Sequence, residues 1–167
     1  QAELAIDEAA GMHGSTWGLG DELAKLEWIG SADLERIRGR AELYDMVFDG
    51  FATRYADALG ADDIELGQRM GPHLVELGER LMEGEGPSER ACLVHGDYRL
   101  DNFLFGTSPD APPITVVDWQ TVSIGSGPSD VAYLLGSGLL PETRERHERQ
   151  LVHHYVDGLA VHGVDVE

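Results

Sequence analysis

Two carboxylates and one amide in the second half of the chain stand next to short apolar runs. Asp97 and Asp118 each follow such a run, and Asn102 opens the run between them. A side chain at the end of a strand is held on a rigid base, from which it can project into a cleft. Oxygen ligands of these types suit Mg²⁺, which takes one or two carboxylates and completes its shell with water and substrate phosphates. The trio therefore predicts a site for magnesium and phosphate that needs no basic pocket.

The residues around this trio form a longer motif. The sequence His-Gly-Asp-Tyr-Arg-Leu-Asp-Asn at 95–102 is followed by Val-Asp-Trp-Gln at 117–120. Asp97 and Asn102 are five positions apart, which is the Asp-to-Asn spacing of the protein-kinase catalytic loop. The motif resembles the catalytic core of the aminoglycoside phosphotransferase and choline kinase-like family, whose members are relatives of the protein kinases. The resemblance implies a phosphotransferase that uses ATP and Mg²⁺ and acts on a hydroxyl of a small molecule.

The resemblance also implies a role for each residue of the motif. Asp97 corresponds to the catalytic base, which orients the acceptor hydroxyl and accepts its proton. Asn102 and Asp118 correspond to the residues that hold the metal and, with it, the nucleotide. His95 is expected to brace the catalytic loop rather than to transfer protons.

Two further charged residues have alternative interpretations. Arg99 lies where protein kinases often place a cation that touches the transferring phosphate, and a local ion pair with Asp101 is the alternative. Asp130 is implied to hold the catalytic loop from below, and capping of the helix that follows it is a second role that the same residue can play. The Gly-Ser-Gly sequence at 125–127 lacks a preceding strand and a following Lys, so a plain connection is expected there rather than a phosphate cradle.

The sequence departs from the kinase pattern in several places. Gly96 replaces the Arg of the kinase H-R-D motif and Trp119 replaces the Phe of D-F-G, which favours the small-molecule branch over protein kinases. The sequence has no Gly-x-Gly-x-x-Gly motif, and its only Lys, Lys25, lies in a helical run. We therefore expect that the β-rich amino-terminal lobe, which covers the nucleotide in such enzymes, is missing from this chain. The expectation is a carboxy-terminal lobe cut at both ends that requires the missing lobe and is inactive alone.

Two other classes of function remain open. A binding or scaffolding protein that keeps this fold without catalysis is favoured by the missing lobe and opposed by the intact trio. A metal-dependent hydrolase would use His147, His153 and His154, which lack the i, i+4 spacing that places two ligands on one helix face.

The elements that must position the motif are mostly helices. In the first half, helical patterns are expected at 2–12, broken by Gly11 and Gly14, from an Asp21 cap through Ile29, and from Leu34 to Gly60 with one apolar stripe. Another helix is expected from Pro72 onward, with Leu74, Leu77 and Leu81 inward. In the second half, helices are expected at 129–135 and from Pro141 to Gly163, the latter with Leu151, Val152, Tyr155 and Leu159 inward. Short strands are expected at 91–94, 102–105 and 114–117, the last two joined in a hairpin by the turn-rich residues 106–113. The predicted fold class is mainly α with a small β-hairpin region (α+β), in the arrangement of a kinase-like carboxy-terminal lobe.

Length and composition favour one globular domain. The 167 residues, 42% of them hydrophobic, predict a single domain over 1–167 with a helical part at 1–86, the motif and short strands at 91–120 and helices at 129–163. A net charge of −19 argues against nucleic acid and anionic membranes as partners, because both require clustered cations. The expected partners are a nucleotide and a small hydroxylated molecule. The lone Cys92, a buried thiol by its apolar neighbours, and the absence of a secretory signal predict a cytoplasmic protein.

Overall fold

The computed structural model describes residues 1–31, 34–83 and 90–165. Contacts divide the chain into two compact units, one of Gln1–Ser31 with Pro87–Glu167 and the other of Ala32–Gly86. We call them the core unit and the hairpin unit and describe each by itself. The single domain expected over 1–167 stays a prediction.

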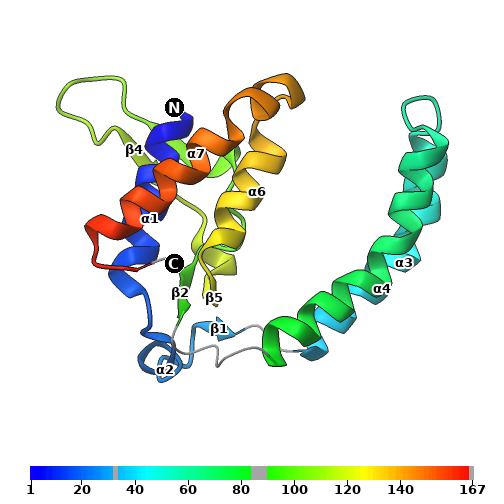
Figure 1. Cartoon of the computed structure of the whole chain (residues 1–167), viewed down its shortest axis with the longest axis horizontal. Coiled ribbons are helices and arrows are strands. Elements are labelled where there is room, and N and C mark those ends of the chain that lie inside the picture. Colours follow the sequence, from blue (N-terminus) through cyan, green and yellow to red (C-terminus); the bar gives the residue numbers. More distant parts are fainter. Residues whose placement is uncertain (32–33, 84–89, 166–167) are drawn as a thin grey trace. The chain divides into compact units, whose positions relative to one another are not determined.

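The core unit combines helices with two small sheets (Figure 1). In chain order its elements are α1 (Ala2–Thr16), α2 (Gly20–Leu23), β1 (Gly30–Ser31), β2 (Ala91–Val94), β3 (Phe103–Phe105), β4 (Ile114–Val116), β5 (Ser123–Ser126), α6 (Pro128–Gly138) and α7 (Pro141–Val161), with 3-10 turns at Leu100–Asn102 and Trp119–Thr121. The mainly helical α+β class is confirmed, as is the hairpin, in which β3 and β4 pair antiparallel with Phe103 opposite Val116. None of the described helices is long and apolar enough to cross a membrane.

The second sheet has the strand order β1-β5-β2, with β5 antiparallel to β2 and parallel to β1. Gly125 lies opposite Cys92, and Ser126 lies opposite Ala91. The plain connection expected at 125–127 is therefore wrong for its first two residues, which belong to β5. Gly has low strand propensity, and Ile124 is the one strongly strand-forming residue of β5, so the local signal for this strand is weak. Pairing with the buried strand β2 supplies the hydrogen bonds that hold it.

Close packing of α1 against α7 explains why α1 continues through its glycines. A Cβ atom at Gly14 would lie 2.7 Å from the Cβ of His162, and one at Gly158 would lie 2.7 Å from the Cβ of Ala10. The two backbones approach too closely for a side chain at these positions. The helix break expected at Gly11 and Gly14 is therefore wrong, because the tertiary contact outweighs the low helix propensity of glycine.

The apolar faces of α1, α6 and α7 meet β3 and β4 in one hydrophobic core, whose buried members include Ile6, Tyr98, Leu134 and Leu159. Tyr98 is fully buried and donates its hydroxyl to the carbonyl of Ala5 at 2.7 Å, and burial raises the pKa of this hydroxyl. Helix α7 buries Leu151, Tyr155 and Leu159 as expected, whereas Val152 is 42% exposed. The helix expected from Asp21 through Ile29 is reduced to the four residues of α2, with Leu19 rather than Asp21 at its N-cap.

The hairpin unit consists of α3 (Leu34–Arg54) and α4 (Ala61–Glu83). The expected boundaries are wrong in two places: α3 ends before Gly60, and Pro72 lies inside α4 instead of opening it. The start of α4 is marked instead by Asp63, whose carboxylate accepts the N–H of Gly60 at 2.8 Å. Acidic residues in the first turn also suit the positive end of the helix dipole.

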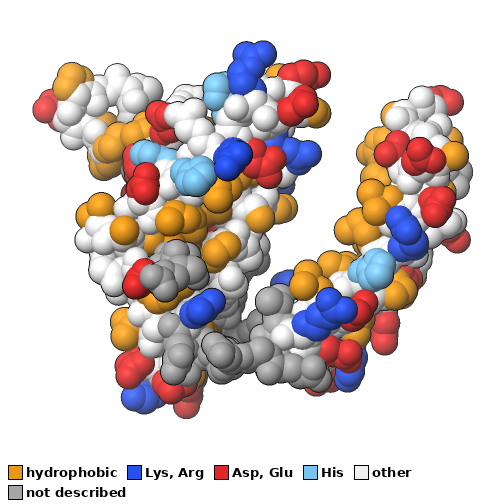
Figure 2. Space-filling model, viewed as in Figure 1, with side chains coloured by type: hydrophobic (Ala, Val, Ile, Leu, Met, Phe, Trp, Pro, Cys, Tyr) orange, Lys and Arg blue, Asp and Glu red, His pale blue; other side chains and the backbone are white. Residues whose placement is uncertain are grey.

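Apolar side chains of this unit are only partly covered within it. Phe48 is buried because Gly67 lets its ring lie against α4, and Tyr44 donates its hydroxyl to the carbonyl of Gly67 at 2.9 Å. Leu74 and Leu77, expected inward, are 37% and 54% exposed, and the side chain of Leu81 lies outside the described part of the chain. Figure 2 shows hydrophobic side chains gathered along one edge of the hairpin.

Candidate active site

The predicted catalytic loop begins where β2 ends, and its first two residues are held by a buried carboxylate. Asp130, in the first turn of α6, is 2% exposed and accepts the backbone N–H of His95 at 2.7 Å and that of Gly96 at 3.0 Å. Hydrogen bonds to a carboxylate are shorter and stronger than those between neutral groups. The N-cap of α6 is Gly127, and Ser129 donates its hydroxyl to the carbonyl of Ser126. The carboxylate of Asp130 is thus engaged with the loop.

Gly96 is required by two features of the loop. Its φ of +82° lies in the left-handed region, and a Cβ atom there would lie 2.7 Å from the carbonyl oxygen of Thr121. The hydroxyl of Thr121 donates to the carbonyl of His95 at 2.8 Å. The close approach of these two segments leaves no room for the Arg that protein kinases have at this point of the motif.

His95 is fully buried and has both ring nitrogens occupied. Its Nε2 lies 3.0 Å from the carbonyl oxygen of Val117, and its Nδ1 lies 3.3 Å from the backbone nitrogen of Asp97. A neutral imidazole that donates from Nε2 and accepts at Nδ1 satisfies both contacts. The ring also packs edge-on against Trp119, with centroids 4.9 Å apart. These contacts position the loop and leave no ring nitrogen for proton transfer.

Asn102 joins the predicted base to the segment that carries Asp118. Its amide nitrogen donates to the backbone carbonyl of Asp97 at 2.8 Å and to Oδ2 of the same residue at 3.0 Å. Its own backbone carbonyl accepts the N–H of Val117 at 2.9 Å. Because both amide protons face Asp97, the side-chain oxygen of Asn102 is the atom available to a metal.

Asp118 has a left-handed backbone, with φ 65° and ψ 60°, and among the described residues it is the only non-glycine residue with positive φ. Such conformations are costly and cluster at functional sites. The preceding Val117 is tied to His95 and Asn102, and the following Thr121 is tied to His95. The Asp118 side chain is exposed, with one hydrogen bond, from Gln120 at 3.3 Å. The structure thus anchors this turn beside the catalytic loop.

Arg99 makes local ion pairs on the exposed side of the loop. Its Nε lies 3.4 Å from Oδ2 of Asp97, and its Nη1 lies 3.8 Å from Oδ2 of Asp101. The pair with Asp101 was one of the two interpretations of this residue, and contact with a phosphate stays a prediction. Asp97 itself is partly exposed, with 26% of its side chain accessible.

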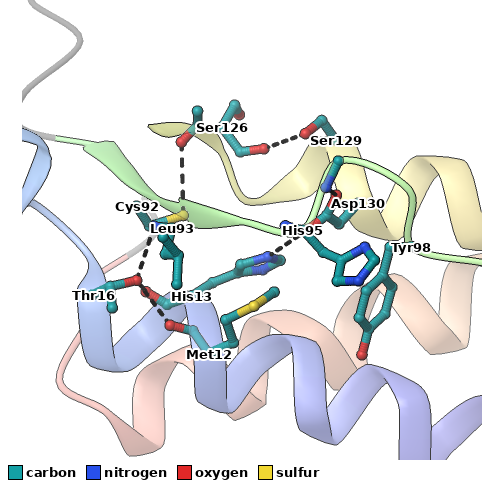
Figure 3. Close-up of polar contacts among 12 residues, drawn as sticks. Met12, His13, Thr16, Cys92, Leu93, His95, Tyr98, Ser126, Ser129 and Asp130 are labelled. Atoms are coloured by element: carbon teal, nitrogen blue, oxygen red, sulfur yellow. Dashed lines mark hydrogen bonds and ion pairs between the residues drawn. The ribbon is translucent and has the colours of Figure 1, made fainter. Parts of the chain in front are cut away.

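A buried histidine that the motif does not contain lies beneath the loop (Figure 3). His13, on α1, has its Nε2 3.3 Å from Oδ2 of Asp130 and its Nδ1 2.8 Å from the hydroxyl of Tyr155. The sequence contained a weak signal for it, because His13 continues the inward helical positions of Ile6 and Ala9 as a polar residue in an apolar stripe. Nothing in the sequence indicated its partners.

The histidines of α7 do not gather into a metal site. His154 pairs with Asp7 of α1, its Nε2 lying 2.7 Å from Oδ1. Throughout the described ranges, no group of three or more His, Cys, Asp and Glu side chains is arranged to hold a metal ion. The combination of Asp118 with the amide of Asn102 is a different kind of donor set.

Comparison with known families decides the broader class. The family model for ecdysteroid kinase-like proteins matches residues 34–166, which is most of the chain. The chain belongs to the ecdysteroid kinase-like family. This family is part of the protein-kinase-like superfamily, so the kinase relationship inferred from the motif is confirmed at that level. The narrower assignment to aminoglycoside phosphotransferases and choline kinases stays a prediction.

Similar curated proteins are much longer than this chain. A probable acyl-CoA dehydrogenase of Arabidopsis thaliana is 46% identical over 105 residues, which cover 63% of this chain and 13% of that protein. Acyl-CoA dehydrogenase family member 10 of Mus musculus is 40% identical over 55 residues, 33% of this chain and 5% of that protein. Acyl-CoA dehydrogenase family member 11 of Rattus norvegicus is 38% identical over 64 residues, which cover 38% of this chain and 8% of that protein. The chain matches only these small parts, and no solved structure matches it.

Proposed function

We propose that this member of the ecdysteroid kinase-like family carries the catalytic residues of a phosphotransferase. The enzyme transfers the γ-phosphoryl group of ATP to a hydroxyl of a small molecule, as aminoglycoside phosphotransferase-like enzymes do. The observation that carries the proposal is the position of Asn102. Its side chain holds Asp97 while its backbone holds the strand end before Asp118. Membership of the kinase-like superfamily supports this interpretation.

Asp97 acts as the base in this proposal. Its Oδ2 accepts the amide of Asn102 and lies beside Arg99, so Oδ1 is the oxygen available to the acceptor hydroxyl. As the acceptor oxygen bonds to the γ-phosphorus, the bond to the β-phosphate oxygen breaks, the hydroxyl proton passes to Asp97 and ADP leaves. The transition state of phosphoryl transfer is loose, so alignment of the acceptor is the main contribution. A positioned base typically contributes about 10² to 10⁴ in rate.

The residues present fit a magnesium ion. The side-chain oxygen of Asn102 and the carboxylate of Asp118 are hard oxygen donors. Asn102 contacts the base directly, and Asp118 follows Val117, whose N–H donates to the backbone carbonyl of Asn102. When bound, the ion would be held by Asn102 and Asp118 and would balance the negative charge of the phosphates during transfer. The chain itself has 12 Lys and Arg against 31 Asp and Glu, so we expect the ion, rather than a cluster of cationic side chains, to balance most of the charge of the triphosphate.

The proposal requires a second structural part. Among the described residues there is no β-rich lobe with a glycine-rich loop that would cover a nucleotide. We propose that such a lobe completes the ATP site in the active protein and that the chain alone has no turnover.

The experiment compares two substitutions in the same loop of the full-length protein. Hydroxylated metabolites and antibiotics are first screened for ATP-dependent ADP release. Asp97→Asn is then expected to lower kcat by at least about 10² with ATP affinity unchanged, whereas the matched control Asp101→Asn, at an 80% exposed side chain, keeps kcat. Activity of the Asp97 variant within a few-fold of wild type would refute its role. Nucleotide-independent binding partners without any turnover would favour the scaffolding alternative.

A further inference from the structure

Three side chains from three helices meet beneath the start of the catalytic loop. His13 of α1 is fully buried, Asp130 of α6 is 2% exposed and Tyr155 of α7 is 3% exposed. The imidazole of His13 lies between the other two, with Nδ1 2.8 Å from the Tyr155 hydroxyl and Nε2 3.3 Å from Oδ2 of Asp130. Figure 3 shows the ring of His13 reaching toward Asp130 beside His95. The function proposed above uses neither His13 nor Tyr155.

The hydrogen-bond chemistry fixes the direction of this chain of contacts. A buried carboxylate is tolerated when it is paired and hydrogen-bonded, and an ionised carboxylate only accepts. Nε2 of His13 must therefore carry the proton that it donates to Asp130. With that single proton on the ring, Nδ1 is left to accept and the Tyr155 hydroxyl to donate. Burial raises the pKa of Tyr155, so this hydroxyl keeps its proton.

The ring of His13 has little freedom to leave this arrangement. A Cβ atom at Gly127 would lie 2.6 Å from the Tyr155 hydroxyl and 2.9 Å from Nδ1 of His13. The backbone just before α6 thus closes one side of the ring. Tyr155 packs edge-on against the same ring, with the two planes at 81° and the centroids 5.7 Å apart.

We propose that His13 and Tyr155 are positioning residues of the catalytic loop. Tyr155 fixes the Nε2–H form of His13, His13 holds the carboxylate of Asp130, and Asp130 receives the amides of His95 and Gly96. The position of Asp97 depends on this arrangement, because the backbone N–H of Asp97 donates to Nδ1 of His95. The consequence for turnover rests on the proposed function, whereas the chain of contacts does not.

The first test is the tautomer of His13. In full-length protein labelled with ¹⁵N-histidine, two-bond nitrogen–hydrogen correlations distinguish the two neutral forms and the charged ring. The signal of His13 is assigned by its loss in His13→Gln. The Nε2–H form supports the proposal, and the Nδ1–H form or a doubly protonated ring overturns it.

The second test replaces His13 by Gln or by Asn, whose side-chain amides extend to different distances from the backbone. The side-chain nitrogen of Gln falls near the place of Nε2 and can still donate to Asp130, whereas the side chain of Asn reaches only as far as Nδ1. Hydrogen exchange of a peptide spanning residues 93–98 reports the two loop amides. We expect exchange at least about tenfold faster in His13→Asn and within about threefold of wild type in His13→Gln. Equal exchange in both variants overturns the proposal, because it leaves His13 only a packing role.

Further arms cover misfolding and function. If His13→Asn does not fold, Tyr155→Phe removes only the hydroxyl, and unchanged exchange in that variant also overturns the proposal. For any acceptor that the wild type phosphorylates, His13→Asn is expected to lower kcat with the KM for ATP unchanged, and an unchanged kcat overturns the positioning role. A wild type without turnover refutes the proposed function alone, since the exchange and tautomer measurements need no substrate.

Discussion

Substitution of Gly96 tests whether the close approach of Gly96 to Thr121 holds the catalytic loop in place. Gly96→Ala adds a single methyl group where φ is +82° and where that carbon would lie 2.7 Å from the carbonyl oxygen of Thr121. Gly163→Ala is the matched control, because φ there is +80° but the structure has nothing within 4 Å of the added carbon. Both variants therefore place an alanine in a left-handed backbone, and only Gly96→Ala adds a steric clash.

The magnitudes follow from these two terms. A left-handed conformation costs an alanine roughly 1–2 kcal/mol, and the reduced entropy of the unfolded chain is the same for both variants. Forcing a methyl group against a backbone oxygen adds roughly 1–3 kcal/mol, as in overpacked cores. After subtracting roughly 0.4–1 kcal/mol for that entropy term, the free energy of unfolding should fall by roughly 1–4.5 kcal/mol for Gly96→Ala and by at most roughly 1.5 kcal/mol for Gly163→Ala.

The assay is urea unfolding of both variants, followed by circular dichroism. With a slope of about 2 kcal/mol per M, the unfolding midpoint of Gly96→Ala should lie about 0.5–1.5 M below that of Gly163→Ala. Phosphotransferase activity, where an acceptor is found, should fall only in Gly96→Ala, because Thr121 and His95 must move apart. Equal midpoints for the two variants would refute the steric argument.

Two further predictions concern Asp118 and Cys92. Asp118→Gly relieves the left-handed backbone, so the free energy of unfolding measured in urea should change by less than about 1 kcal/mol. The same substitution removes a proposed ligand, so calorimetry should show the Mg²⁺-dependent nucleotide affinity weakened more than about tenfold. Retained affinity would exclude Asp118 as a ligand. Burial raises the pKa of the Cys92 thiol from 9.0 to about 12, so iodoacetamide at pH 8 should modify it, by mass spectrometry, only after unfolding. Because only the unfolded thiol ionises between about pH 9 and pH 12, this group should make stability fall as pH rises through that range, and a stability that rises there would contradict the assignment.

The candidate catalytic motif was accessible from sequence because its contacts are local. Asn102 reaches Asp97 across five positions, and the hairpin of β3 and β4 is joined by one turn. Apolar runs that end in a polar residue predict such strands and their side chains directly. The periodicity of α7 was visible for the same reason, since residues three and four apart share a face of the helix.

Other features depend on contacts that leave no local pattern. β5 is built from Ser, Ile and Gly and becomes a strand because β2 pairs with it. The interior position of Pro72 contradicts the usual helix-start signal, and α4 continues past it while packed against α3, where Gly78 lies against Ile37.

The sequence by itself determined which residue types make up the candidate site, and the types and spacing of Asp97, Asn102 and Asp118 predicted the base and the oxygen donors that we propose. Only the tertiary structure decided what holds them. His13 and Asp130 are 117 positions apart, and His13 and Tyr155 are 142 apart. Contacts at such separations depend on which faces of α1, α6 and α7 pack together. That choice is made by the burial of the whole core and not by any segment of the chain.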